Sequence, residues 1–175
     1  MMLVSCYSLT NVTRAASSHQ QKSMPNHLRR ATPDNAAAVR ALVRAAYAKW
    51  VPIIGREPQP MMADYDHAVR NHIVDLLLVD DELTALIELV VEPDCVLIEN
   101  VAVRPDQAGR GHGRALLAHA VKVARSKGRG RLRLYTNRLM VENIALYRRL
   151  GYAIDREETT PDGRRVVHMS VTIHA

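Results

Sequence analysis

The sequence contains no phenylalanine, one tryptophan and two cysteines, and these shortages argue against several classes of function. With only 4% aromatic residues, the chain offers few rings on which nucleic-acid bases could stack. Cys6 and Cys95 lie far apart in dissimilar surroundings, which argues against a disulfide framework and a cysteine-based metal site. No apolar run approaches the roughly 18 residues that a transmembrane helix requires. The remaining composition is that of an ordinary globular protein, for which we expect a cytoplasmic location.

The first part of the chain lacks acidic residues altogether. Residues 1–27 are rich in Ser, Thr, Asn and Gln, show no sustained hydrophobic period, and carry only Arg14 and Lys22 as basic residues. Segments of this kind rarely bury enough apolar surface to fold. We therefore expect residues 1–27 to be an unfolded extension or a segment upstream of a working start at Met24. A transit peptide is the alternative. The rest, residues 28–175, is expected to form one domain.

Hydrophobic spacing and turn residues predict a single α/β or α+β domain without internal repeats. Helices are expected where apolar residues recur at three- and four-residue intervals, and strands where β-branched and apolar residues cluster between turns. The expected helices are 33–50, 63–71, 113–127 and 143–150. The expected strands are 76–79, 83–91, 95–103, 131–136, 152–157 and 166–173.

The most informative segment is a glycine-spaced turn between the strand at 95–103 and the helix that follows it. Gly109, Gly111 and Gly113 remove Cβ atoms where backbone N–H groups must turn toward a common point. The helix adds its unpaired N–H groups and the positive end of its dipole. This combination suits a phosphate or pyrophosphate, and the net charge of +6 also suits an anionic ligand.

The chain contains Pro105 with the turn Gly109–Gly113 and, further on, the segment Asn143–Tyr152. These two segments, in this order, resemble the GNAT superfamily, the acetyl-CoA-dependent N-acyltransferases. The similarity covers about residues 28–173 and extends to Tyr47 with Trp50, 54–58 and 134–137. It implies a mixed, mostly antiparallel central sheet flanked by helices on both faces. There is one departure: Ala108 stands where the family usually has Gln or Arg, and Gln107 comes one residue early.

The resemblance implies that acetyl-CoA binds as the acyl-donor substrate, with no metal required. The turn would hold the pyrophosphate through backbone N–H groups, and the strand before it would pair with the pantetheine arm. Arg110 and Arg114 would assist electrostatically or remain solvated surface, and Asn143 would contact pantetheine or act as a helix N-cap. The implied cofactor-binding residues are Val101, Ala102, Val103, Ala108, Gly109, Arg110, Gly111, His112, Gly113, Arg114 and Asn143.

Direct acyl transfer to an amine needs a proton donor for the thiolate and usually a base for the amine. The resemblance makes Tyr147 the donor, although a helix Tyr beside Leu146 and Leu150 is also a common core residue. Glu99 is the first candidate for the base, because it is the only carboxylate in an apolar strand and alternates there with Leu97, Val101 and Val103. Glu88 is the second candidate. A structural carboxylate at position 99 and a water chain remain open.

The acceptor site is expected to form from the first helix and the proline-rich loop after it. Arg56 could recognise a carboxylate on the acceptor, while a lid that only covers the cofactor is the alternative. The histidines show no ligand spacing, so we expect no metal site. The predicted acceptor-site residues are Tyr47, Trp50, Arg56, Met61 and Tyr65.

The resemblance therefore predicts an acetyl-CoA-dependent N-acetyltransferase with a small-molecule or protein amine as acceptor. A catalytically silent acyl-CoA-binding regulatory domain is the alternative. The basic residues of 125–133 are better explained as a helix end and an exposed strand face than as a nucleic-acid site. No Gly-Lys-Ser/Thr follows the glycines, and no dinucleotide-type βαβ unit contains them, which excludes two other phosphate-binding classes. The oligomeric state stays open, with a homodimer among the options.

Overall fold

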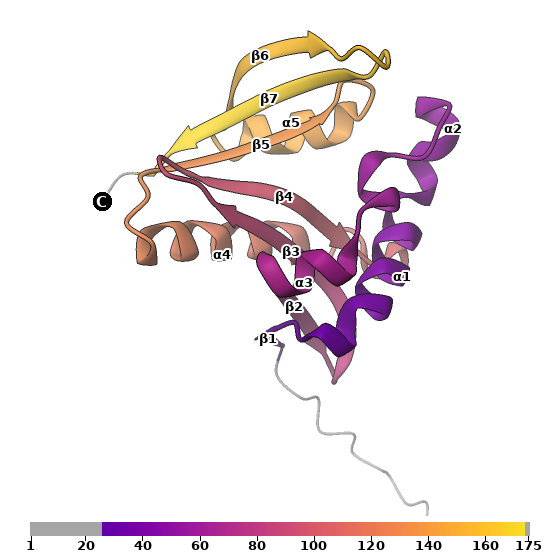
Figure 1. Cartoon of the computed structure of the whole chain (residues 1–175), viewed down its shortest axis with the longest axis vertical. Helices are drawn as coiled ribbons and strands as arrows, with labels where there is room; N and C mark the ends of the chain where they lie inside the picture. The colour runs from indigo at the N-terminus through magenta and orange to yellow at the C-terminus, as the bar shows by residue number, and fades with distance from the viewer. Residues whose placement is uncertain (1–25, 174–175) are drawn as a thin grey trace, which may run out of the picture.

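A computed structural model describes residues 26–173, and its centre is one seven-stranded sheet (Figure 1). The strand order is β1-β2-β3-β4-β5-β7-β6, and every neighbouring pair is antiparallel except β4 and β5. This confirms the mixed, mostly antiparallel sheet. The strands are β1 (His27–Arg30), β2 (Ile73–Val79), β3 (Glu82–Val91), β4 (Val96–Val103), β5 (Arg131–Asn137), β6 (Ala153–Thr159) and β7 (Arg165–Thr172).

Helices cover both faces of the sheet, as expected. Along β2 and β3 successive side chains point to opposite faces, so Leu76 and Leu86 belong to one hydrophobic cluster and Leu77 and Ile87 to the other. The first cluster packs under α1 (Ala36–Tyr47) and α3 (Tyr65–Asn71), and the second under α4 (His112–Ser126) and α5 (Val141–Arg149). A short α2 (Val51–Ile54) continues the first helical segment. Within residues 26–173, no helix has the length and apolarity needed to cross a membrane.

Strand β1 was not predicted. All four of its residues are exposed, so no buried alternation marks it in the sequence. It pairs antiparallel with β2, and Arg30 Nε donates to Asp75 at 2.7 Å. The edge position explains the missing signal, because one side of such a strand is paired and neither face is buried. The predicted extension 1–27 lies almost wholly outside the described residues.

The sheet splits where β4 and β5 separate. The two strands pair only between Val96–Ile98 and Leu132–Leu134. Beyond that point β4 continues beside β3 and β5 beside β7, and the two halves diverge in Figure 1. One edge of β4 from Glu99 onward is therefore left without a partner strand.

A β-bulge at this point corrects one sequence prediction. Glu88 pairs with Asn100 but Leu89 pairs with Ile98, so Glu99 is an extra residue in β4. Ile98 and Val101 consequently contribute to the same hydrophobic cluster, although they are an odd number of positions apart, 98 and 101. The expectation that Glu99 shares a face with Val101 and Val103 is wrong, because simple alternation does not continue through the bulge.

Candidate active site

The glycine turn between β4 and α4 has the geometry of an anion site. Gly109 (φ +78°) and Gly111 (φ +87°) occupy the left-handed region, which side chains disfavour, and Gly111 caps α4. Among the described residues, the backbone N–H groups from Gly109 to Arg114 have no hydrogen-bond acceptor. No acidic residue lies in the first turn of α4. The N–H groups and the helix dipole thus present uncompensated positive potential to a bound anion.

Side chains around this turn differ in their surroundings. Arg110 and Arg114 are exposed, which leaves them able to approach a bound anion or to stay in solvent. Nε2 of His112 is the one buried side-chain nitrogen or oxygen within residues 26–173 that lacks a hydrogen-bond partner. A polar atom left in this condition is a place where a ligand group can bond.

A groove of about 270 Å³ lies beside the turn, between β4, α1 and α5; we call it the β4–α5 groove. It follows the part of β4 that has no partner strand. Among its lining residues are seven of the predicted cofactor or catalytic positions, together with two from the predicted acceptor set. These are Val101, Ala102, Val103, Ala108, Gly113, Asn143 and Tyr147, then Tyr47 and Trp50.

Tyr147, the one tyrosine of α5, lines this groove. Burial raises its pKa to about 12, so the hydroxyl keeps its proton throughout the neutral range. Its ring packs at 5.8 Å from that of Tyr152, and its hydroxyl makes no hydrogen bond to any described residue. Asn143 does not cap α5, because the cap position is Met140; the N-cap alternative is therefore wrong. A protonated phenol thus faces the same groove as the free edge of β4.

A second cavity of about 480 Å³ lies on the α3 side of the sheet; we call it the β4–α3 cavity. Of the residues predicted for the acceptor site, Arg56 and Tyr65 line this cavity. Trp50 lines only the β4–α5 groove, and Met61 is buried and lines neither. Carboxylates dominate its charged lining. Those carboxylates are Glu57, Asp64, Glu88, Glu99 and Asp162.

Both candidate bases belong to this cavity, in different electrostatic settings. Glu88 is buried and lies 2.6 Å from Nδ1 of His72. Burial raises the pKa of the Glu88 carboxyl above its ordinary value, and His72 opposes that effect. Glu99 is half-buried and accepts a hydrogen bond from the Tyr135 hydroxyl. Within the described part of the chain, Glu99 has no ion-pair partner, which leaves its carboxylate open to a cation.

A chain of buried hydrogen bonds connects the groove to the cavity. Tyr47, which lines the groove, donates to Asn100 Oδ1 at 2.9 Å. Asn100 Nδ2 donates to the Tyr65 hydroxyl at 3.1 Å, and that hydroxyl donates to the Pro60 carbonyl at 2.7 Å. Burial raises the pKa values of both tyrosines, so they stay neutral donors. Asn100 was not among the predicted site residues, although an amide inside an apolar strand is a usable signal.

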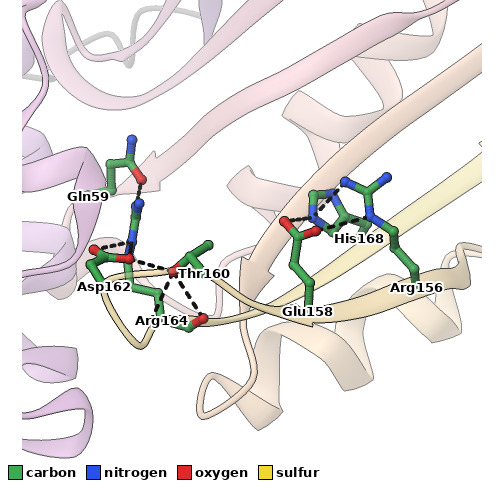
Figure 2. Close-up of polar contacts among 7 residues, drawn as sticks. All are labelled: Gln59, Arg156, Glu158, Thr160, Asp162, Arg164 and His168. Carbon is green, nitrogen blue, oxygen red and sulfur yellow. Dashed lines mark hydrogen bonds and ion pairs between the residues drawn. The ribbon is translucent and has the colours of Figure 1, made fainter.

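The tip of the β6–β7 hairpin contributes Asp162 and Arg164 to the lining of the cavity, and Figure 2 shows both residues beside Gln59. Arg164 donates a hydrogen bond to Gln59 and forms an ion pair with Asp162 at 2.8 Å. Arg56 donates to the Asp162 carbonyl at 3.0 Å. Arg56, which the sequence suggested for acceptor recognition, is therefore already partnered. No local pattern could reveal Asp162 and Arg164, because they reach the proline-rich loop from about 100 residues away.

One group of potential metal ligands lies away from these hollows, among the described residues. Glu92, Asp94 and Cys95 place ligand atoms within 4.8 Å of one another at the β3–β4 turn. Cys95 donates to Glu92 at 3.0 Å, and Arg133 donates to the same carboxylate at 3.2 Å. Burial raises the pKa of the Cys95 thiol to about 11, which disfavours the thiolate that a metal would need. Cys6 lies outside the described residues.

The comparisons with known proteins identify the class. A model of the acetyltransferase (GNAT) family matches residues 33–152, and the chain belongs to this family of acetyltransferases. Streptothricin acetyltransferase from Streptomyces lavendulae is 35% identical over 80 residues, which make up 42% of each chain. The match thus spans less than half the length of that relative.

Solved structures share the fold. The ribosomal-protein-S18-alanine N-acetyltransferase from Escherichia coli superimposes with a TM-score of 0.66 at 21% identity, covering 86% of this chain and 96% of that one. The PaiA N-acetyltransferase from Thermoplasma acidophilum, solved in complex with coenzyme A, gives a TM-score of 0.68 at 16% identity, covering 83% and 98%. At these identities the similarity concerns the fold alone.

Proposed function

We propose that this chain is an N-acetyltransferase that moves the acetyl group of acetyl-CoA directly to a primary amine of a small molecule or protein. The proposal rests on the β4–α5 groove and the β4–α3 cavity, which lie on either side of β4. One contains a protonated phenol and leads to unpaired N–H groups, and the other contains a carboxylate without a cationic partner. Tyr47 belongs to the hydrogen-bond chain that joins them. The groove would supply the proton donor for the leaving sulfur, and the cavity would supply the base for the amine.

The β4–α5 groove is suited to the donor. The N–H groups of residues 109–114 would hold the pyrophosphate, and the free edge of β4 at 101–103 would bond the amides of pantetheine. The departing sulfur would then lie near Tyr147. The CoA complex of the PaiA relative supports this assignment through the shared fold.

The reaction can be written from this chain's own groups. Glu99 takes a proton from the acceptor ammonium, whose ordinary pKa is near 10. The freed nitrogen lone pair forms a bond to the thioester carbonyl carbon, and the carbon–sulfur bond breaks. Tyr147 gives its proton to the leaving sulfur, and the second proton of the attacking nitrogen passes through water to the phenolate, which restores the phenol. The proton held by Glu99 is released to solvent. The products are an amide and free CoA thiol.

Charge in the β4–α3 cavity favours a positively charged acceptor. Asp162 pairs with both Arg56 and Arg164, the two arginines of the lining. Glu57 pairs with Arg44 at 2.5 Å. Since these partners are already engaged, an acceptor carboxylate would meet Glu99 without a free guanidinium to compensate it. We therefore expect the cavity to select ammonium groups.

The experiment is a thiol-release assay with acetyl-CoA and four acceptors of matched length: butylamine, 4-aminobutanol, 1,4-diaminobutane and 4-aminobutanoate. The amines are expected to release CoA, with 4-aminobutanoate about tenfold slower in kcat/KM than 4-aminobutanol because of like-charge repulsion. Tight acetyl-CoA binding without release by any of these acceptors or by lysine-containing peptides would contradict the proposal. That result would favour the silent acyl-CoA-binding domain.

Gly111→Ala tests the pyrophosphate site separately. A Cβ in the left-handed conformation costs about 1–2 kcal/mol, so the turn should relax and misdirect its N–H groups. We expect KM for acetyl-CoA to rise about tenfold while kcat stays within about threefold. Gly128→Ala is the matched control, since Gly128 has φ +64° at the far end of α4. It should lower thermal stability similarly without changing that KM; equal KM effects in both variants would contradict the assignment.

A further inference from the structure

The point where the sheet splits contains a single side-chain bridge between its halves. Glu99 and Tyr135 are the first residues of β4 and β5 beyond the last paired residues, Ile98 and Leu134. In place of a continued ladder, the Tyr135 hydroxyl donates a hydrogen bond to the Glu99 carboxylate. Both side chains line the β4–α3 cavity. The bridge therefore crosses the gap at the place where donor and acceptor would meet.

Glu99 depends on this bridge for its orientation. As the bulged residue, it is the one position of β4 that the β3 pairing skips between Ile98 and Asn100. Its carboxylate has no other hydrogen bond to a described residue. Without Tyr135, a half-buried carboxylate on a bulge would have several rotamers open to it. One hydroxyl thus selects the direction in which the carboxylate points.

The Tyr135 side chain is itself positioned by its neighbour on β7. It pairs with His168 across β5 and β7, and the two rings lie 6.1 Å apart. His168 is fixed in turn by Glu158 at 2.9 Å, with Arg156 beside both, as Figure 2 shows. Burial and the neighbouring Glu99 raise the pKa of Tyr135, so its hydroxyl stays a donor at neutral pH. The phenol ring is therefore braced by a different half of the sheet from the one that contains Glu99.

We propose that Tyr135 is the positioning residue for Glu99, holding the carboxylate toward the acceptor. This rests on the proposed function, in which Glu99 is the base. Tyr135 keeps its own proton throughout; the acceptor's proton moves to the carboxylate and from there to solvent. The other charged or titratable groups that line the same cavity are Tyr65, His67 and His72 at α3, Glu88 on β3, Arg56, Glu57 and Asp64 in the loop, and Asp162 and Arg164 in the hairpin.

The test is kcat at saturating amine in Tyr135→Phe, which retains the ring and removes one oxygen. Loss of the hydrogen bond opens other rotamers to the Glu99 carboxylate. We expect kcat to fall about tenfold, while KM for acetyl-CoA stays within about twofold. Tyr65→Phe removes a hydroxyl from the same cavity that does not touch Glu99, so it is the matched control for the Glu99 resonance described below.

Two further measurements separate positioning from a general loss of structure. In a Glu99→Gln background the effect of Tyr135→Phe should shrink to within about twofold, since no carboxylate is left to orient. The side-chain carboxyl 13C resonance of Glu99, identified by its loss in Glu99→Gln, should change its chemical shift in Tyr135→Phe and not in Tyr65→Phe. That resonance reports the contact without any turnover, so it remains decisive if the proposed reaction fails. An unchanged resonance and an unchanged kcat in Tyr135→Phe would overturn the proposal.

Discussion

Replacing Tyr147 with phenylalanine is expected to lower kcat about 100-fold and to leave KM for acetyl-CoA within about twofold. The substitution removes one hydroxyl from the β4–α5 groove and keeps the ring that packs on Tyr152. General acids contribute roughly 100- to 10,000-fold, and a thiol with an ordinary pKa near 8.5 is a fair leaving group. The expected loss therefore lies at the lower end of that range. Steady-state kinetics with saturating amine measure it.

The pH dependence of wild-type activity gives a second test of Tyr147 as the proton donor. Because burial raises the pKa of Tyr147 to about 12, the phenol is in its acid form across the accessible range. Activity that depends on that proton would be lost only as pH rises through about 12, so wild type should show no basic limb from this group below about pH 10. Tyr152→Phe is the control: its buried ring contacts Tyr147 but does not line the groove. A Tyr147→Phe variant within about threefold of wild-type kcat would assign protonation of the sulfur to water.

The glycine turn could be predicted from the local sequence. Glycine readily adopts a positive φ, which other residues rarely do, and the structure places Gly109 and Gly111 there. The role predicted for Tyr147 came from the family resemblance, and in the structure its side chain lines the β4–α5 groove. Residues 101–114 and 143–147 each form one contiguous segment, so near neighbours in the sequence set their local geometry.

The proposed acceptor side could not be predicted from the local sequence, because contacts between residues far apart in the sequence set its geometry. The bulge at Glu99 depends on how many residues β3 offers opposite β4, and no periodicity in β4 alone reveals that count. Arg164 and Asp162 reach Arg56 and Gln59 only because β7 joins the sheet beside β5. Tyr135 becomes significant only once β4 and β5 separate. These contacts arise from tertiary topology, which sequence spacing does not encode.

Glu99→Gln is expected to lower kcat/KM about 100-fold at neutral pH, with a loss that shrinks as pH rises. Under the proposed function, wild type binds the abundant ammonium form and removes its proton inside the cavity, so its rate should not follow the fraction of free amine as pH rises toward about 10. The variant reacts only with the free amine, whose fraction grows tenfold per pH unit until about pH 10. Its kcat/KM should therefore rise with that slope and approach wild type in alkaline solution.

The slope decides between the two carboxylates that are candidates for the base. Glu88 lies beside His72 and is deeply buried, whereas Glu99 is half-buried and has no cationic partner among the described residues. If Glu88→Gln gave the tenfold-per-unit slope while Glu99→Gln stayed flat, the base would be Glu88 and the bridge from Tyr135 would have a structural role. A flat profile in both variants would instead require a water chain to remove the proton. Only loss of the carboxylate that accepts the proton converts a flat profile into a rising one, because simple loss of ammonium binding lowers the rate equally at every pH below 10.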